Sequence, residues 1–202
     1  TPGLDEYRDW MVRRLRALGA VAEENPGDPR PDWLYGATDG PAPPTVVCRR
    51  QTGSGPRILI ACHLDTVFDP ADPFREMTLS LDGATASGPG VIDMKGGTIM
   101  ALHVLEALED AGLRLSWTFL LNSDEETGSH HSRQTLLDEA ARHDVGLATE
   151  PALADGSLAI ERMGSGQFQI ETVGRSAHTG RAFREGVSAV NALADAILKA
   201  AA

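Results

Sequence analysis

The chain has 202 residues, 42% of them hydrophobic and 5% aromatic, enough to bury the core of one domain and the beginning of another. Its net charge of −11 argues against nucleic acid or an anionic membrane as a partner, because both are bound by clustered Lys and Arg, but it does not oppose a bound cation. No stretch approaches the ~20 apolar residues of a membrane span.

Two cysteines, Cys48 and Cys62, lie in apolar stretches. We predict buried thiols in a reducing compartment rather than a disulfide. The N-terminal residues lack the positive-then-apolar pattern of a secretory signal, so a cytoplasmic protein is expected. Thr1 is not a natural start, which leaves open whether further residues precede it.

The N-terminal part predicts one helix and a few strands. Apolar residues recur at helical spacing over residues 5–18. The Pro- and Gly-rich residues 25–44 are expected to form a loop. Apolar runs at 45–50 and 57–62 predict two strands joined by a tight turn, and 79–81 a further short strand.

The middle of the chain alternates between strands and helices. Residues 115–121 and 145–149 have the character of strands, whereas 98–109 and 131–142 have the spacing of helices. This succession is typical of an α/β fold with a largely parallel sheet. Residues 1–164 are therefore predicted to form most of one domain.

The pattern changes after Gly164. Phe168, Ile170 and Thr172 alternate with polar residues, which predicts a strand with one wet face, and residues 187–199 predict an amphipathic helix. One strand and one helix cannot bury a core. Residues 165–202 are therefore expected to begin a second domain, and the chain is expected to be a fragment.

His63 and Asp65 follow the apolar strand at 57–62. Alternate residues of a strand point to the same side, so the imidazole and the carboxylate should lie together. A carboxylate that fixes the tautomer of a histidine is common at metal sites. Taken alone, an ordinary His–Asp hydrogen bond explains the pair equally well.

More acidic residues follow the other predicted strands or lie in the loops behind them: Asp93, Asp124-Glu125-Glu126 and Glu150. The carboxyl ends of parallel strands share one crevice, where gathered carboxylates repel one another unless a cation neutralises them. One histidine with several carboxylates suits Zn²⁺, and also Mn²⁺ or Co²⁺, and two metals could share one carboxylate. Of two adjacent glutamates, one can bind metal while the other acts as general base.

Each acidic residue also has an ordinary explanation. A solvated loop accounts for residues 124–126, a helix cap for Asp93 and a surface turn for Glu150, so the metal hypothesis depends on their coincidence. The glycine-rich residues 88–97 fit neither nucleotide-binding pattern, and Gly128-Ser129 lacks the flanks of a nucleophile elbow. Nucleotide binding and serine hydrolysis are therefore disfavoured.

Five motifs occur in the order and spacing of one known family: His63-Leu64-Asp65, the Gly-Pro-Gly-Val-Ile-Asp-Met-Lys-Gly-Gly of residues 88–97, Asp124-Glu125-Glu126-Thr127-Gly128-Ser129, Thr149-Glu150-Pro151 and Gly174-Arg175-Ser176-Ala177-His178-Thr179-Gly180. From residue 57 onward the sequence resembles the co-catalytic zinc family that includes glutamate carboxypeptidase, aminoacylase, acetylornithine deacetylase and succinyl-diaminopimelate desuccinylase. Residues 124–133 most resemble the glutamate carboxypeptidase branch.

The resemblance implies a three-layer α/β catalytic domain with a mostly parallel mixed sheet, and an α+β dimerisation (lid) domain that begins at residue 165. It also implies two zinc ions, with Co²⁺ or Mn²⁺ as substitutes. His63 and Glu150 would bind the first zinc and Glu126 the second, with Asp93 bridging both. Glutamate at position 150 is typical of the carboxypeptidase and deacylase branches.

The resemblance further implies that Asp65 supports His63 and that Glu125 is the general base. His178 would reach the active site of the partner subunit in a homodimer and stabilise the oxyanion. The Asp93–Met94 peptide bond is expected to be cis. The expected reaction is hydrolysis of an amide bond next to a free carboxylate, in a small peptide or an N-acyl amino acid, by a zinc-bridged hydroxide.

Two residues of the family pattern, a histidine for the second metal and an arginine for the substrate carboxylate, are expected beyond residue 202. We therefore expect the fragment alone to bind one metal weakly, or none, and to be inactive. His130 and His131 are not expected to replace the missing histidine. A non-catalytic pseudoenzyme or binding module of the same fold is the alternative, and the exact substrate stays open.

Overall fold

The computed structural model of the chain describes residues 2–33, 42–53, 55–69, 71–164, 166 and 168–200. It divides into two compact units: the first ends at Arg162, and the second holds the residues from Met163 onward together with a short segment that includes Trp33. Residues 34–41 of the predicted loop lie outside the described residues. The elements in chain order are α1 (Pro2–Ala17), β1 (Val21–Asn25), β2 (Thr45–Arg50), β3 (Arg57–His63), β4 (Thr78–Leu79), β5 (Ala86–Ser87), the turn η1 (Val91–Lys95), α2 (Gly96–Asp110), β6 (Ser116–Asn122), the 3₁₀ turn η2 (Glu125–Thr127), α3 (Arg133–Arg142), β7 (Val145–Ala148), the 3₁₀ turn η3 (Phe183–Glu185) and α4 (Ala189–Ala200).

The first unit is built on a five-stranded mixed sheet in the order β1-β2-β6-β3-β7. β3 runs parallel to both β6 and β7, whereas β2 is antiparallel to β1 and β6. β4 and β5 form a separate two-stranded hairpin. The three parallel strands β6, β3 and β7 therefore end at the same edge of the sheet.

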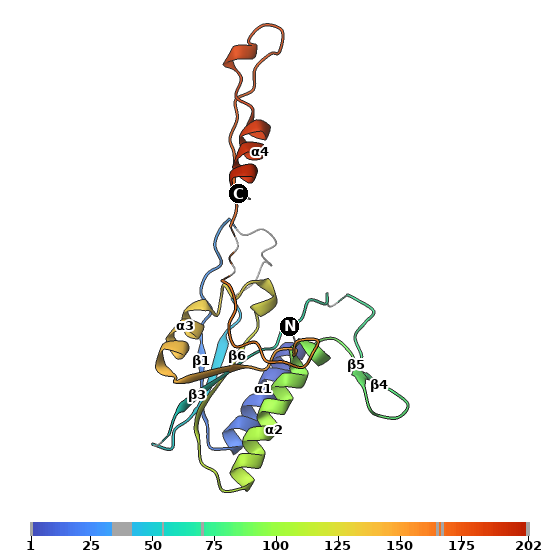
Figure 1. Cartoon of the computed structure of the whole chain (residues 1–202), viewed down its shortest axis with the longest axis vertical. Helices are drawn as coiled ribbons and strands as arrows, with labels where there is room; N and C mark the ends of the chain where they lie inside the picture. Colours follow the sequence, from blue (N-terminus) through green and yellow to red (C-terminus); the bar gives the residue numbers. More distant parts are fainter. Residues whose placement is uncertain are drawn as a thin grey trace. The chain divides into compact units, whose positions relative to one another are not determined.

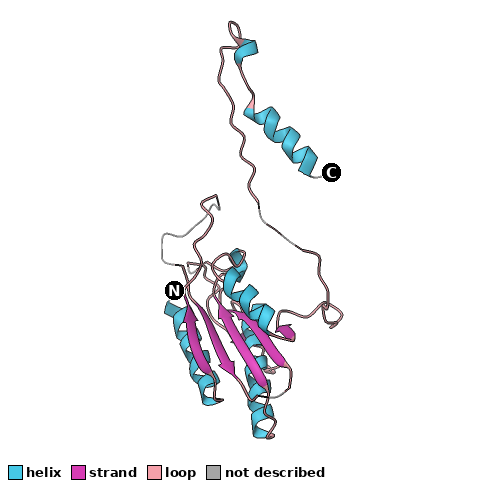
Figure 2. Ribbon diagram, turned by 90° about the vertical axis from the view of Figure 1, so that its left-hand side faces the viewer, coloured by secondary structure: helices cyan, strands magenta, loops and turns pink. Residues whose placement is uncertain are grey.

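Helices cover both faces of this sheet (Figures 1 and 2). On one face, Ile60, Phe119 and Leu121 pack in one cluster with Met11 of α1 and Leu102 of α2. On the other face, a smaller cluster of Val47, Leu59 and Leu120 contacts Leu136 of α3. Neighbouring strand residues belong to opposite clusters because successive side chains of a strand point to opposite faces. The predicted three-layer α/β fold is confirmed.

The sequence did not predict β1, whose residues are Val-Ala-Glu-Glu-Asn. The strand pairs with β2 on one side only and is mostly exposed, so it needs no alternation of apolar residues. Charged residues are common on such edge strands because they discourage pairing with another chain. A short acidic edge strand therefore leaves little trace in the hydrophobic pattern.

The second unit holds α4, the turn η3 and an isolated bridge between Arg175 and Val187. The strand predicted at 168–172 is wrong for the described structure, since these residues pair with no other described strand. An alternating pattern becomes a strand only where a partner accepts its backbone hydrogen bonds. The predicted boundary at 164/165 remains a prediction.

Cys48 and Cys62 are both free and buried, as predicted. Burial raises the pKa of each thiol to about 11, so both are neutral at physiological pH. None of the helices that the structure describes combines the length and the apolar character needed to cross a membrane.

Candidate metal centre

His63 is the last residue of β3 and is buried. It lies beside Asn122, the last residue of the parallel neighbour β6, and the backbone N–H of Leu64 extends this pairing by donating to the Asn122 carbonyl. Nδ1 of His63 is 3.1 Å from the backbone oxygen of Asp65 and 3.4 Å from its carboxylate. Its Nε2 faces the acidic residues at the end of the sheet.

Asp93 lies in the turn η1, directly before α2. The Asp93–Met94 peptide bond is cis, as predicted, and the Met94 sulfur accepts a hydrogen bond from the backbone N–H of His63 over 3.1 Å. Oδ1 of Asp93 is 3.0 Å from Nε2 of His63. The turn thus brings this carboxylate to the end of β3.

Glu125 and Glu126 open the 3₁₀ turn η2, which follows β6. Their backbone N–H groups donate to the carboxylate of Asp65 over 3.3 and 3.0 Å. Oε2 of Glu125 lies 4.0 Å from Nε2 of His63. The side chain predicted to support the histidine therefore also anchors the turn that carries both glutamates.

Glu150 follows β7, and its Oε1 lies 3.8 Å from Nε2 of His63. The end of this strand is held against the start of α2 by a very close approach. A Cβ atom added at Gly97 would lie only 1.8 Å from the backbone oxygen of Thr149, so no side chain fits there. This contact keeps the segment that carries Glu150 next to the helix that follows Asp93.

The charges of these residues perturb one another. Burial lowers the pKa of His63, but its hydrogen bonds to Asp65 and Asp93 and the nearby charges outweigh burial and raise this pKa to about 9. The pKa values of Glu126 and Glu150 are raised, first by burial and then by neighbouring carboxylates such as Asp93. Keeping these carboxylates ionised side by side therefore costs free energy, and a bound cation would remove this cost.

His63, Asp93 and Glu126 each offer a ligand atom, and these atoms all lie within 4.8 Å of one another. Imidazole nitrogens and carboxylate oxygens are both ligand types that bind Zn²⁺ in proteins. Glu150 and Glu125 lie at the same histidine nitrogen. The donor set fits a divalent metal ion.

Two residues in this region stand in the predicted motifs, but the sequence analysis gives neither of them an individual role. Lys95 lies near the negative charges of Asp65 and Glu126, and its pKa is lowered because burial outweighs those charges. The carboxylate of Asp124 is buried and bonded to backbone N–H groups seven and eight residues further along the chain. No pattern within a single segment reveals either arrangement.

His178 lies in the second unit, in an exposed turn. Its Nδ1 accepts a hydrogen bond from the backbone N–H of Gly180 over 3.1 Å, so in the neutral ring the proton is on Nε2. The backbone oxygen of His178 accepts from Ala182. The turn fixes the tautomer of the ring, and the predicted role of His178 stays a prediction.

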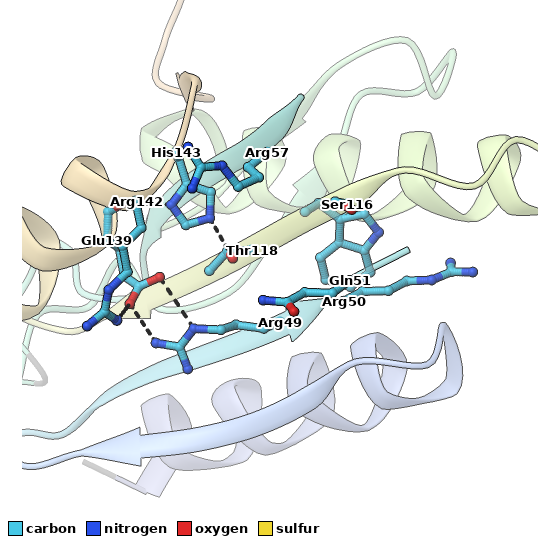
Figure 3. A pocket seen from close by; sticks show the side chains of 10 residues that line it. Arg49, Arg50, Gln51, Arg57, Ser116, Thr118, Glu139, Arg142 and His143 are labelled. Atoms are coloured by element: carbon cyan, nitrogen blue, oxygen red, sulfur yellow. Dashed lines mark hydrogen bonds and ion pairs between the residues drawn. The ribbon is translucent and has the colours of Figure 1, made fainter. Parts of the chain in front are cut away.

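Two hollows lie outside the cluster. One, of about 910 Å³, is lined by apolar residues of α2, β7 and the following segment, and shares only Glu150 with the cluster. The other, of about 190 Å³, lies where β3 and β6 begin (Figure 3), whereas His63 is the last residue of β3. Its Arg49 and Arg142 both pair with the buried carboxylate of Glu139, an ion-pair network that ties α3 to the sheet.

Comparison with known proteins shows the family of the chain. Residues 59–201 match the peptidase family M20/M25/M40. The chain belongs to this family. Within the M20 family it is 36% identical over 161 residues to carboxypeptidase G2 of Pseudomonas sp. (strain RS-16), a match that covers 76% of this chain and 38% of that protein. It is 33% identical over 147 residues to acetylornithine deacetylase of Salmonella arizonae, covering 69% of this chain and 36% of the relative.

This M20 chain thus spans less than two fifths of the length of either relative. Among solved structures, a tripeptidase from Staphylococcus aureus superposes with a TM-score of 0.57 at 20% identity, covering 95% of this chain and 49% of that one. An M20 metallo-carboxypeptidase from Sulfolobus solfataricus gives a TM-score of 0.54 at 22% identity, covering 76% and 34%. These likenesses show the fold.

Proposed function

We propose that the protein is a metal-dependent hydrolase that cleaves an amide bond next to a free carboxylate, of the carboxypeptidase or deacylase type. The observation that carries this proposal is the convergence of His63, Asp93 and Glu126 within 4.8 Å, with Glu125 beside them. Relatives named as a carboxypeptidase and as an acetylornithine deacetylase support amide hydrolysis.

In this proposal four residues would hold two zinc ions: His63 and Glu150 would be ligands of the first, Glu126 of the second, and Asp93 would serve both. Co²⁺ or Mn²⁺ could replace zinc, since carboxylate-rich sites accept them. When bound, zinc supplies Lewis-acid activation of water and of a carbonyl group at neutral pH.

Glu125 is proposed to be the general base. Its side chain is 48% exposed, whereas His63 is 1% exposed, so the glutamate can meet a substrate while the histidine stays fixed. The carboxylate takes a proton from the attacking water and delivers it to the leaving nitrogen. Asp65 keeps His63 and the two glutamates in place through the hydrogen bonds described above.

The remaining proposals concern the whole protein. Residues 165–202 are proposed to begin a dimerisation domain, from which His178 would enter the partner subunit's site and stabilise the oxyanion. A homodimer in the cytoplasm is the proposed form. Residues 1–202 alone are proposed to be inactive, because among the residues that the structure describes we assign only Asp93 and Glu126 to the second metal.

The test is hydrolysis by the full-length protein loaded with zinc, using a panel of N-acyl amino acids and short peptides. Each substrate is paired with its C-terminal amide, which removes the free carboxylate. We expect the carboxylates to be cleaved and the amides spared. Equal cleavage of both, or of neither, would contradict the proposed substrate class, and cleavage of neither would favour a non-catalytic protein.

The variant Glu125→Ala tests the division of roles. Losing a general base should lower kcat by about 10²- to 10⁴-fold, while the zinc content stays near that of the unmodified protein. Glu76→Ala, at an exposed position outside the cluster, is the matched control. Loss of zinc from the Glu125 variant would show that base and ligand have been exchanged.

A further inference from the structure

Asp124 is the residue immediately before the two glutamates, and it is only 3% exposed. Its Oδ2 accepts hydrogen bonds from the backbone N–H groups of His131 and Ser132 over 2.6 and 3.1 Å. These two residues directly precede α3, whose cap residue Ser132 provides no side-chain cap bond. The carboxylate therefore compensates unpaired N–H groups at the start of this helix.

The backbone oxygen of Asp124 holds the other side of the same loop. It accepts from the backbone N–H of Ser129 over 2.7 Å, and from both the backbone N–H and the hydroxyl of Thr127. The loop from Glu125 to Ser132 is thus closed onto one residue through both its main chain and its side chain. Because the loop is closed this way, the turn η2 has little freedom to shift.

The last strand residue, Asn122, connects Asp124 to the sheet. Its Nδ2 donates to Oδ1 of Asp124 over 3.4 Å and to the hydroxyl of Ser132 over 3.0 Å. Asn122 is itself buried and lies beside His63 in the strand register. A continuous set of hydrogen bonds therefore runs from the strand ends to the start of α3.

We propose that Asp124 is a positioning residue, which holds the turn η2 so that Glu125 and Glu126 reach the metal centre. The proposal rests on the proposed function for the roles of these glutamates. Asp65 fixes their backbone N–H groups from one side, and Asp124 fixes the loop from the other. Without Asp124, the turn keeps one anchor and loses the other.

The first test is Asp124→Asn in the full-length protein. The new amide keeps one acceptor for the N–H groups of His131 and Ser132, but its NH₂ group then faces the NH₂ group of Asn122, so one bond becomes a donor–donor contact. We expect zinc affinity and kcat each to fall by about 10- to 100-fold, the usual cost of losing a residue that orients metal ligands. KM should change little, since the Asp124 carboxylate is buried and bonded to backbone groups of its own loop.

Glu139→Gln is the matched control. Glu139 is also a buried carboxylate, it lies within α3, and its two arginine partners are at the opposite end of the sheet (Figure 3). Because each variant loses a buried charged hydrogen bond, both should have a lower melting temperature than the unmodified protein. Only the Asp124 variant should lose zinc affinity, which is measured by competition with a chromophoric chelator.

The double variant Asn122→Asp with Asp124→Asn provides the rescue. It exchanges acceptor and donor between the two positions, so that the carboxylate at 122 accepts from the amide at 124 and from the hydroxyl of Ser132. We expect zinc affinity to return toward its original value. The proposal is overturned if the Asp124→Asn variant binds zinc as tightly as the Glu139→Gln variant. It is also overturned if the double variant binds zinc no better than Asp124→Asn alone.

The zinc measurement also separates the two proposals. If the unmodified protein binds zinc but hydrolyses none of the substrates, the proposed function fails, and the comparison of zinc affinities still decides the role of Asp124. If the unmodified protein is active and the Asp124 variant has unchanged zinc affinity and kcat, only the positioning role fails.

Discussion

The carboxylate of Asp65 accepts a hydrogen bond from the backbone N–H of Glu126 over 3.0 Å. The same carboxylate lies 3.4 Å from Nδ1 of His63, which belongs to another strand end. One buried side chain thus fixes a histidine and the start of a neighbouring loop together. A change at Asp65 should therefore disturb ligands from both segments at once.

Asp65→Asn is expected to lower zinc affinity by about 10- to 100-fold, because the new NH₂ group faces a backbone N–H that needs an acceptor. Chelator competition measures the affinity. Asp69→Asn is the matched control, since the Asp69 carboxylate is exposed and accepts a local hydrogen bond from the backbone N–H of Ala71. Equal affinities of the two variants would contradict the proposed role of Asp65.

Zinc binding should depend steeply on pH. The pKa of His63 is about 9 in the metal-free protein, above its usual 6.5, so the stabilisation from its protonated ring is complete below about pH 6.5 and is lost as the pH rises through about 9. A metal ion needs the unprotonated nitrogen, so affinity should rise about tenfold per pH unit between these values and level off above them. Titrations at several pH values test this, and a flat profile would exclude His63 as a ligand.

Gly97→Ala should destabilise the fold by about 1–3 kcal/mol, because a methyl group cannot fit against the backbone oxygen of Thr149. Urea denaturation measures the change. Gly146→Ala is the matched control, because a Cβ atom at Gly146 would have open space around it. Gly112 is unsuitable because its backbone is left-handed. A loss of stability at Gly146 as large as that at Gly97 would argue against the close approach.

Leu121→Ala should cost about 2–5 kcal/mol of unfolding free energy, because its side chain is fully buried between the sheet and its covering helices. Leu147→Ala provides a matched control, since this leucine of β7 is 49% exposed. The difference in unfolding free energy between the two variants measures how much the burial of Leu121 contributes to stability. Similar losses would mean that β7 is buried in solution.

The sequence predicted the strands whose apolar runs are unbroken. β3 and β6 are buried along most of their length, so their composition alone identifies them, and His63 follows from its place at the end of β3. β1 could not be predicted, because an exposed edge strand needs few apolar residues. Residues 168–172 show the converse error, in which a strand-like pattern pairs with none of the strands that the structure describes.

The candidate site could be predicted only where one short segment carries its own signal. The acidic residues at 93, 125, 126 and 150 were recognisable because they follow predicted strands or precede a helix. The hydrogen bonds of Asp124 to His131 and Ser132, and the position of Lys95 near Asp65, depend on how loops fold back. Such contacts are determined by tertiary structure, which local patterns do not encode.

The approach of Gly97 to Thr149 has a consequence for how this protein can evolve. Because Gly97 has no side chain, the helix start that follows Asp93 can approach the strand end that precedes Glu150. Any larger residue would push these two segments apart and move the two acids apart. A library randomised at position 97 and screened for zinc binding should therefore return mainly glycine, although this residue has no side chain that could bind the ion.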